Sequence, residues 1–299
     1  MDLVTPAYKA GAKVAQTLPR PVIEGAAPWL AGAWSRRPSE RRRMVERHQQ
    51  RVRPWLQGPA LRRQVGAVYE SYGRYYAESF RLPAVGEAEI DARMSVDGYE
   101  HFEQALSGPI GALTVLPHLG SWEWVAYWLA RVKDIPVTAV VERIEPDALF
   151  EWFTDFRREM GVHVVPLGPE AGRAVTRALK EHHVIALLCD RDIGGKGVEV
   201  EFFGERTTLP GGPATLALRT GAPILPVAIY DRPGGMHHAV CKPPLDTERR
   251  GSLRESVARI TQDIATALEE LIRVAPEQWH LLQPNWPSDR EPVAADGLA

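Results

Sequence analysis

Residues 112–141, ALTVLPHLGSWEWVAYWLARVKDIPVTAVV, contain the pattern that decides the fold class. The apolar run Ala112–Leu116 predicts a buried strand that ends at Pro117, and Val137–Val141 predicts a second strand. Between them, residues 121–132 have the length and composition of a helix. Two short apolar strands joined by a helix are typical of a parallel pair, so this stretch predicts a sheet covered by helices.

The same alternation continues toward the C-terminus. Further strands are expected at 162–166, 184–189, 198–203 and 224–229, and near Ala239. Further helices are expected at 146–160, 170–181, 213–220 and 253–274. This order predicts an α/β fold with a mainly parallel central sheet, flanked by helices on both faces and preceded by a helical N-terminal extension.

The N-terminal extension is predicted to be helical and basic. Ser39 is expected to cap a helix that runs to Val52, and apolar residues at steps of three and four predict another helix over 60–80. Residues 1–59 contain eleven Lys and Arg but only four Asp and Glu, while the whole chain has a formal net charge of −2. Such a segment indicates a polyanionic partner, whether anionic lipid, nucleic acid or a phosphorylated ligand.

Apolar and aromatic residues precede the arginine cluster: Val22, Ile23, Trp29, Leu30 and Trp34. Rings that enter the headgroup region beside arginines that meet lipid phosphates form a membrane-surface segment. The alternative is a helical hairpin that packs on the core and leaves its basic face in water. We expect a basic membrane-surface extension over 1–59, an α/β domain over 60–290 and a flexible tail over 291–299.

Composition excludes several classes of protein. The chain has 299 residues, 44% hydrophobic and 25% charged, which is ordinary for a globular protein and not for a disordered or fibrous one. Its two cysteines, Cys189 and Cys241, fit neither a disulfide scaffold nor a cysteine-rich zinc site. No signal peptide is expected in 1–20. The longest uncharged stretch, 104–122, is broken by Gly and Pro residues, so no membrane-spanning helix is predicted.

Candidate catalytic residues follow the strands at their carboxyl ends, where the functional residues of parallel sheets collect. His118 comes directly after the first strand, and Glu123 lies in the first turn of the next helix. A histidine near a carboxylate has the parts of a general base. The alternative is a loop histidine beside a carboxylate that only interacts with the helix dipole.

Two further segments lie at the ends of strands. Asp190 follows the strand Val184–Leu188 and is expected to partner His118 across the sheet edge, the alternative being a salt-bridged surface turn over 190–192. The loop 209–214 opens a helix whose first amides, near Gly212, can receive an anion or an oxyanion. The alternative there is ordinary turn chemistry.

Several segments occur in an order that carries a resemblance. They are Pro117-His118 followed after four intervening residues by Glu123, then Glu142-Arg143, Arg157, DRD at 190–192, GVEVEFFGE at 197–205, Gly212-Pro213-Ala214 and WHLLQPNW at 279–286. Over roughly residues 60–287 the chain resembles the bacterial family of lipid A lauroyl and myristoyl acyltransferases. The resemblance is closest to the actinobacterial branch that acylates phosphatidylinositol mannosides.

The resemblance implies a membrane-associated acyltransferase with a fold like that of lysophospholipid acyltransferases. Acyl-CoA is the implied donor substrate, and no cofactor is implied. The histidine of the family's His-x4-Asp/Glu motif is the general base, so that role falls on His118, with Glu123 as the acid of the motif. In the phosphatidylinositol mannoside branch an acidic residue partners the histidine. That residue is Asp190 here, where glutamate is more usual, and Arg157 matches the branch's active-site arginine.

Acyl transfer suits these residue types. A sugar hydroxyl is a poor nucleophile, and His118 can remove its proton as the oxygen attacks a thioester. The oxyanion needs donors, which backbone amides or Arg157 can supply. Further expected substrate-binding residues are Arg143, Arg191, Glu199 and Gly212. For Arg143, the alternative to a bound phosphate is a salt bridge with Glu142 or Asp147.

Other chemistries have little support. The pairs His182-His183 and His237-His238 are expected at surface turns, because neighbours on a strand point to opposite faces, and no metal site is predicted. The chain has no Walker A motif, no Gly-x-Gly-x-x-Gly and no Gly-x-Ser-x-Gly, so neither a nucleotide cofactor other than coenzyme A nor an α/β-hydrolase mechanism is expected. No recognition motif accompanies the basic N-terminus, so no nucleic-acid partner is expected.

The predicted function is transfer of a long-chain acyl group from acyl-CoA to a membrane glycolipid, on a mannose of a phosphatidylinositol mannoside. The alternatives are the same chemistry on lipid A or another glycolipid, and a non-catalytic lipid-binding protein of the membrane surface. The expected location is the cytoplasmic face of the inner membrane, bound peripherally to anionic lipid. Four tryptophans have two interpretations: they line an acyl groove, or they pack in the core. They are Trp122, Trp124, Trp128 and Trp152.

Overall fold

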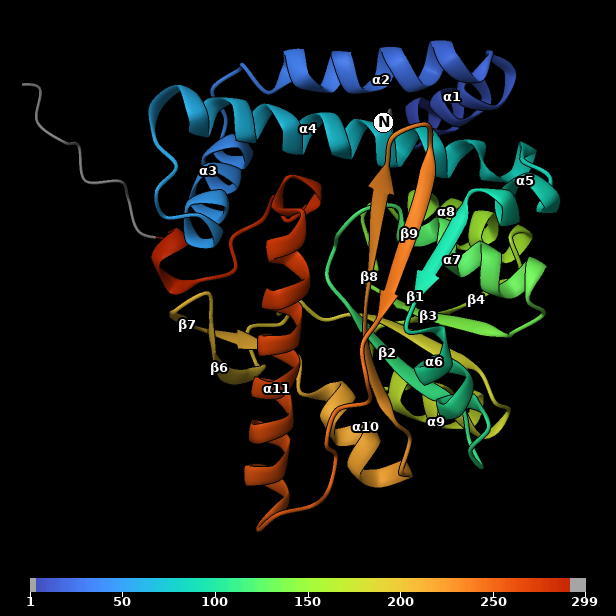
Figure 1. Ribbon diagram of the computed structural model, residues 1–299, viewed down its shortest axis with the longest axis vertical. Coiled ribbons are helices and arrows are strands. Elements are labelled where there is room, and N and C mark those ends of the chain that lie inside the picture. The colour runs from blue at the N-terminus through green and yellow to red at the C-terminus, as the bar shows by residue number, and fades with distance from the viewer. Residues whose placement is uncertain (1–3, 291–299) are drawn as a thin grey trace, which may run out of the picture.

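The computed structural model describes residues 4–290, so the predicted tail over 291–299 lies outside the described residues. A seven-stranded sheet runs in the order β1-β9-β8-β2-β5-β3-β4 (Figure 1). Its strands are β1 (Met94–Asp97), β2 (Ala112–Leu116), β3 (Val137–Val141), β4 (Val162–Pro166), β5 (Val184–Leu188), β8 (Ile224–Arg232) and β9 (Met236–Cys241). The five strands from β8 to β4 in this order are parallel to one another. Strand β9 pairs antiparallel with β8, and β1 pairs parallel with β9. The prediction of a mainly parallel sheet is confirmed.

Helices cover both faces of the sheet, as the sequence predicts. Along β2, Leu113 and Val115 join one apolar cluster, whereas Ala112 and Leu116 join another on the opposite face. The first cluster is completed by α9 (Ala171–Lys180), α10 (Gly212–Thr220) and α11 (Leu253–Val274). The second is completed by α6 (Tyr99–Leu106), α7 (Trp122–Tyr127) and α8 (Asp147–Glu159).

Two segments differ from their predictions. The helix expected over 121–132 is α-helical only to Tyr127 and continues as a π-helical turn over Trp128–Val132. The strand expected over 198–203 is β6 (Val198–Phe202), which pairs outside the main sheet with β7 (Glu205–Leu209). Phe203 and Gly204 make the tight turn between them, with φ values of 53° and 75°. Neither β7 nor β1 was predicted from the sequence.

The N-terminal helices lie over the carboxyl end of the sheet. They are α1 (Val4–Thr17), α2 (Arg20–Trp34), α3 (Glu40–Val52), α4 (Gly58–Arg81) and the short α5 (Glu87–Ala92). In Figure 1, β8 points toward α4, and α2 lies along the outer side of α4. The two helices pack so closely that a Cβ on Gly73 would lie 2.7 Å from the carbonyl oxygen of Ala27. Ser39 caps α3 as predicted, accepting a hydrogen bond from the Arg42 N–H at 3.1 Å.

Some of the N-terminal arginines contact the protein itself. Arg51 of α3 pairs with the buried carboxylate of Asp289 at 2.8 Å and stacks over Trp286. Arg42 pairs with Glu46 at 2.8 Å. The arginines that remain exposed are Arg36, Arg37, Arg41 and Arg43. Only part of the basic segment is therefore available to an external partner. Within residues 4–290, no helix combines the length and hydropathy needed to cross a membrane.

Candidate active site

Strands β2 and β5 bring His118 and Asp190 together. Their register pairs Leu116 with Leu188, so the second residue beyond each strand lies at the same level of the sheet edge. His118 Nδ1 is 2.6 Å from Asp190 Oδ1, and the His118 backbone N–H donates to Oδ2 at 2.9 Å. The short side chain of aspartate therefore reaches the imidazole.

Asp190 is fully buried and is stabilised as an anion. The Trp279 indole N–H donates to Oδ2 at 2.7 Å. Burial alone would raise the pKa of Asp190, but the charge and hydrogen bonds of His118, with the indole N–H, lower it below its ordinary value. An ionised Asp190 holds the proton on Nδ1 of His118 and leaves the lone pair of Nε2 available. The His118 side chain is 31% exposed, so a substrate can approach it.

The segment after α11 fixes the loop that carries His118. The His280 N–H donates to the His118 carbonyl at 2.7 Å, and the Gly120 N–H donates to the Gln278 carbonyl at 3.0 Å. Gly120 has a φ of 62°, and a Cβ there would lie 2.1 Å from the carbonyl oxygen of Ile229. Glycine is required at this position, and the loop has little freedom to move.

Glu123 belongs to a second polar group. It accepts hydrogen bonds from Arg157 of α8 at 2.7 Å and from Tyr75 of α4 at 3.3 Å. Burial would lower the pKa of Arg157, but the adjacent Glu123 carboxylate raises it. Arg158, by contrast, pairs with the exposed Asp155. Within residues 4–290 no hydrogen bond joins Glu123 to His118, so the carboxylate of the motif holds Arg157 rather than the imidazole.

The other predicted substrate-binding residues make contacts of their own. Arg143 pairs with Asp147 at 3.0 Å, which is one of the two salt bridges expected for it, and Arg191 pairs with Glu142. Glu199 pairs with Arg206 at 3.4 Å on the exposed face of the β6–β7 hairpin. Gly212 is exposed at the first position of α10.

Helix α4 contributes polar contacts that were not predicted from the sequence. Ser71 Oγ lies 2.9 Å from Nε2 of His280, and Glu78 accepts a hydrogen bond from Ser121 at 3.0 Å. With Tyr75 between them, these residues follow each other at steps of four and three, so they share one face of the helix. That spacing of polar residues within an otherwise apolar pattern was the available signal.

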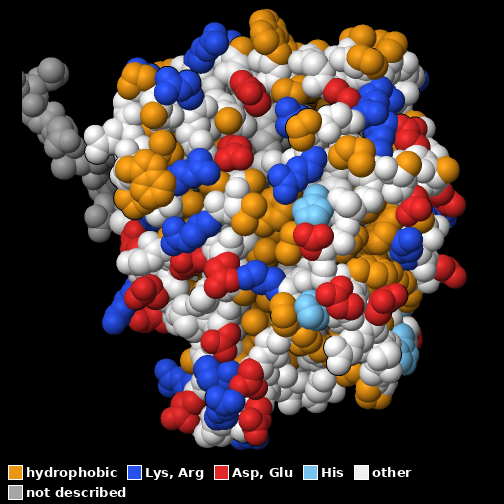
Figure 2. Space-filling model, in the orientation of Figure 1, with side chains coloured by type: hydrophobic (Ala, Val, Ile, Leu, Met, Phe, Trp, Pro, Cys, Tyr) orange, Lys and Arg blue, Asp and Glu red, His pale blue; other side chains and the backbone are white. Residues whose placement is uncertain are grey.

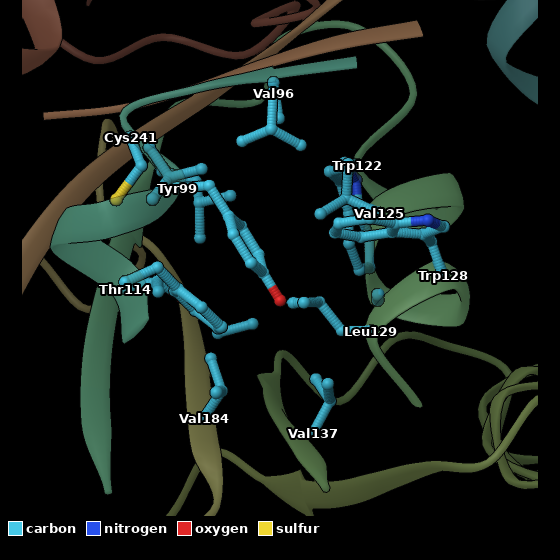
Figure 3. A pocket seen from close by; sticks show the side chains of 16 residues that line it. Val96, Tyr99, Thr114, Trp122, Val125, Trp128, Leu129, Val137, Val184 and Cys241 are labelled. Atoms are coloured by element: carbon cyan, nitrogen blue, oxygen red, sulfur yellow. The ribbon is translucent and has the colours of Figure 1, made fainter. Parts of the chain in front are cut away.

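An apolar pocket lies beside the loop of His118 (Figure 3). Leu116 and Trp122, on either side of this loop in the sequence, both line it. Figure 3 shows the ring of Tyr99 projecting into the pocket, with its hydroxyl toward Leu129. The other walls of the pocket come mainly from β2, β5, α6 and α7.

The four tryptophans of the predicted groove divide between pocket and core. Trp122 and Trp128 line the pocket. Trp124 is buried against His237, with ring centroids 4.2 Å apart. Trp152 packs on Phe80 and other rings between the N-terminal helices and α8.

The predicted position of His237-His238 at a surface turn is wrong. Both residues lie on β9, and His237 is fully buried because Trp124 of α7 stacks on its ring and Glu78 of α4 lies next to it. His182 does lie in an exposed turn after α9.

The sequence is similar to those of known acyltransferases. Residues 3–288 match the family of bacterial lipid A biosynthesis acyltransferases. The phosphatidylinositol mannoside acyltransferase of Mycobacterium tuberculosis (strain ATCC 25618 / H37Rv) is 37% identical over 228 residues, which cover 75% of this chain and 70% of the relative. The phosphatidylinositol mannoside acyltransferase of Mycolicibacterium smegmatis (strain ATCC 700084 / mc(2)155) is 36% identical over 228 residues, which cover 75% of this chain and 73% of the relative.

Proposed function

The chain belongs to the family of bacterial lipid A biosynthesis acyltransferases, and we propose that it moves a long-chain acyl group from acyl-CoA to a mannose hydroxyl of a phosphatidylinositol mannoside. The observation that carries this proposal is the contact between His118 and the buried Asp190 at 2.6 Å, beside an apolar pocket. The named relatives support the choice of acceptor, because both are phosphatidylinositol mannoside acyltransferases.

In the proposed mechanism His118 is the general base. Its Nε2 removes the proton of the acceptor hydroxyl as the oxygen attacks the thioester carbonyl carbon. The new C–O bond forms, the C–S bond breaks, and coenzyme A leaves as a thiolate that can take the proton from the imidazolium. Asp190 stabilises that imidazolium and keeps the ring oriented. General-base catalysis of this kind contributes a factor of about 10² to 10⁴ in rate.

The proposed donor site joins this pair to the apolar pocket. The acyl chain would lie among the side chains of Tyr99, Trp122 and Leu129, where its burial is favourable. The thioester carbonyl would then lie near His118, because Trp122 is only four residues after His118 in the sequence. Arg157, kept protonated by Glu123, and backbone amides are the proposed donors to the oxyanion.

The proposed membrane contact is the outer surface of α1 and α2. Trp29, Leu30 and Trp34 are 70%, 60% and 59% exposed on α2. Figure 2 shows hydrophobic side chains interspersed with Lys and Arg along the upper edge of the molecule, where these helices lie. Large exposed apolar side chains beside cations suit an anionic lipid surface. We propose that the protein binds peripherally to the cytoplasmic face of the inner membrane.

The acceptor and the chemistry are tested together by product analysis. The full-length protein would be incubated with palmitoyl-CoA and vesicles that contain phosphatidylinositol mannoside, lipid A or neither, and lipids would be identified by mass spectrometry. Acylated phosphatidylinositol mannoside is the expected product. Acylated lipid A alone would overturn the acceptor and keep the reaction. Vesicle binding with no acylated product would favour the non-catalytic lipid-binding alternative.

A further inference from the structure

Three buried ionisable side chains meet behind the loop of His118. They are Glu78 of α4, Asp231 of β8 and His237 of β9, which are 4%, 6% and 0% exposed. One donor atom from each lies within 4.8 Å of the other two. This cluster is separate from the His118–Asp190 pair and from the pocket.

The contacts within the cluster leave polar atoms without partners. His237 Nδ1 is 3.2 Å from Asp231 Oδ1, but His237 Nε2 is 3.9 Å from Glu78 Oε2, which is too far for a hydrogen bond. Among residues 4–290, neither His237 Nε2 nor Asp231 Oδ2 has a hydrogen-bond partner. Buried donors and acceptors are rarely left unpaired, so these atoms point to a missing ligand.

We propose that Glu78, Asp231 and His237 bind a divalent transition-metal ion, for which Zn²⁺ is the best fit. Zinc binds imidazole nitrogen and carboxylate oxygen at about 2.0–2.2 Å, so an ion fits between the two atoms that are 3.9 Å apart. Two carboxylates balance the charge of one divalent cation. The imidazole favours Zn²⁺ over Mg²⁺ and Ca²⁺, which prefer ligand sets of oxygen alone.

The surroundings of the cluster hold these ligands in place. Trp124 stacks on the His237 ring, with centroids 4.2 Å apart. Gln278 fixes the Asp231 backbone twice, accepting from its N–H at 2.7 Å and donating to its carbonyl at 3.0 Å. Supporting contacts of this kind orient metal ligands before the ion binds. The ion would tie α4 to the β8–β9 hairpin and, through the Ser121 hydroxyl on Glu78, steady the loop of His118.

Metal content and thermal stability test the site independently of acyl transfer. The full-length protein, without an affinity tag, would be purified without chelator and analysed by mass spectrometry for metals. We expect about one Zn²⁺ per chain, a fall in Tm of about 5 °C after EDTA treatment, and recovery when Zn²⁺ is added. Replacement by Co²⁺ should give visible absorption bands.

Matched variants locate the ion. Glu78→Gln and His237→Gln should each lose the metal, whereas His238→Gln, a change in the next residue of β9, should keep it. Circular dichroism would show that each variant is folded. The proposal would be overturned if the purified wild type contained no metal and its Tm changed neither with EDTA nor with Zn²⁺. Metal retained in both Glu78→Gln and His237→Gln would overturn it as well.

Discussion

His118 binds both carboxylate oxygens of Asp190, one through its ring Nδ1 at 2.6 Å and the other through its own backbone N–H at 2.9 Å. The two residues lie seventy-two positions apart in the sequence. They meet because β2 and β5 are parallel neighbours in register, and each residue lies just past the carboxyl end of its strand. This double contact fixes both the position and the tautomer of the proposed base.

Trp279→Phe should lower kcat about tenfold and leave KM nearly unchanged, because it removes the indole hydrogen bond to Asp190 and keeps the ring. Trp286→Phe is the matched control, since its buried indole donates to the Phe202 carbonyl instead. Steady-state kinetics on both variants would check this. Equal effects of the two substitutions would contradict a role for Trp279 in positioning Asp190.

Tyr99→Ala should shift donor preference toward longer acyl chains, because it removes a ring that projects into the apolar pocket. The measurement is kcat/KM across a series of saturated acyl-CoA donors of increasing length. Leu268→Ala, which truncates a buried residue of the other apolar cluster, controls for loss of stability. An unchanged chain-length profile in Tyr99→Ala would argue against the pocket as the acyl site.

A Trp29→Glu, Leu30→Glu double variant should bind anionic vesicles at least tenfold more weakly, because two large side chains leave the proposed membrane surface and two negative charges enter it. Co-sedimentation with vesicles would measure the change. Leu253→Glu alters an exposed leucine at the start of α11, at the opposite end of the molecule in Figure 1. Similar losses in both proteins would contradict the assignment of this surface to α2.

His280 should make the protein less stable in mild acid. Burial, together with nearby His118, lowers its pKa to about 4, despite the opposing charges of Asp231 and Asp190. In the unfolded chain the histidine takes up a proton near pH 6.5, whereas in the folded protein it stays neutral down to about pH 4. Its contribution to stability is therefore complete above about pH 6.5 and is lost as the pH falls toward 4, by at most about 3 kcal/mol.

Urea unfolding of His280→Gln over this pH range would test the prediction. The free energy of unfolding should depend less on pH than in the wild type, while His163→Gln, which changes an exposed histidine, should match the wild type. An unchanged pH dependence in His280→Gln would show that this residue does not titrate differently on folding.

Much of the sheet could be predicted because its strands are apolar runs with clear ends. Ala112–Leu116, Val137–Val141 and Val162–Pro166 coincide with β2, β3 and β4. The last helix is also predicted to the residue, Leu253–Val274, because its amphipathic pattern spans many turns and Ser252 caps it. Strand β1 has only four residues and β7 is mostly polar, so neither produced a hydrophobic signal.

The candidate site was only partly accessible from the sequence. The order of strands and helices was enough to pair His118 with Asp190, because both follow parallel strands. The partner of Glu123 could not be predicted from the sequence, because its contact with Arg157 depends on how α7 packs against α8. The burial of His237 likewise depends on Trp124 and Glu78, which lie against its ring but are far away in the sequence.

The proposed function depends most on the role of His118 as the base in transfer from acyl-CoA to a glycolipid. Release of free coenzyme A thiol from palmitoyl-CoA would be followed for wild type and His118→Ala, with and without phosphatidylinositol mannoside vesicles. We expect acceptor-dependent release by the wild type and a loss of at least about 10²-fold in the variant, with the fold intact by circular dichroism. Near-normal, acceptor-dependent release by His118→Ala would contradict it.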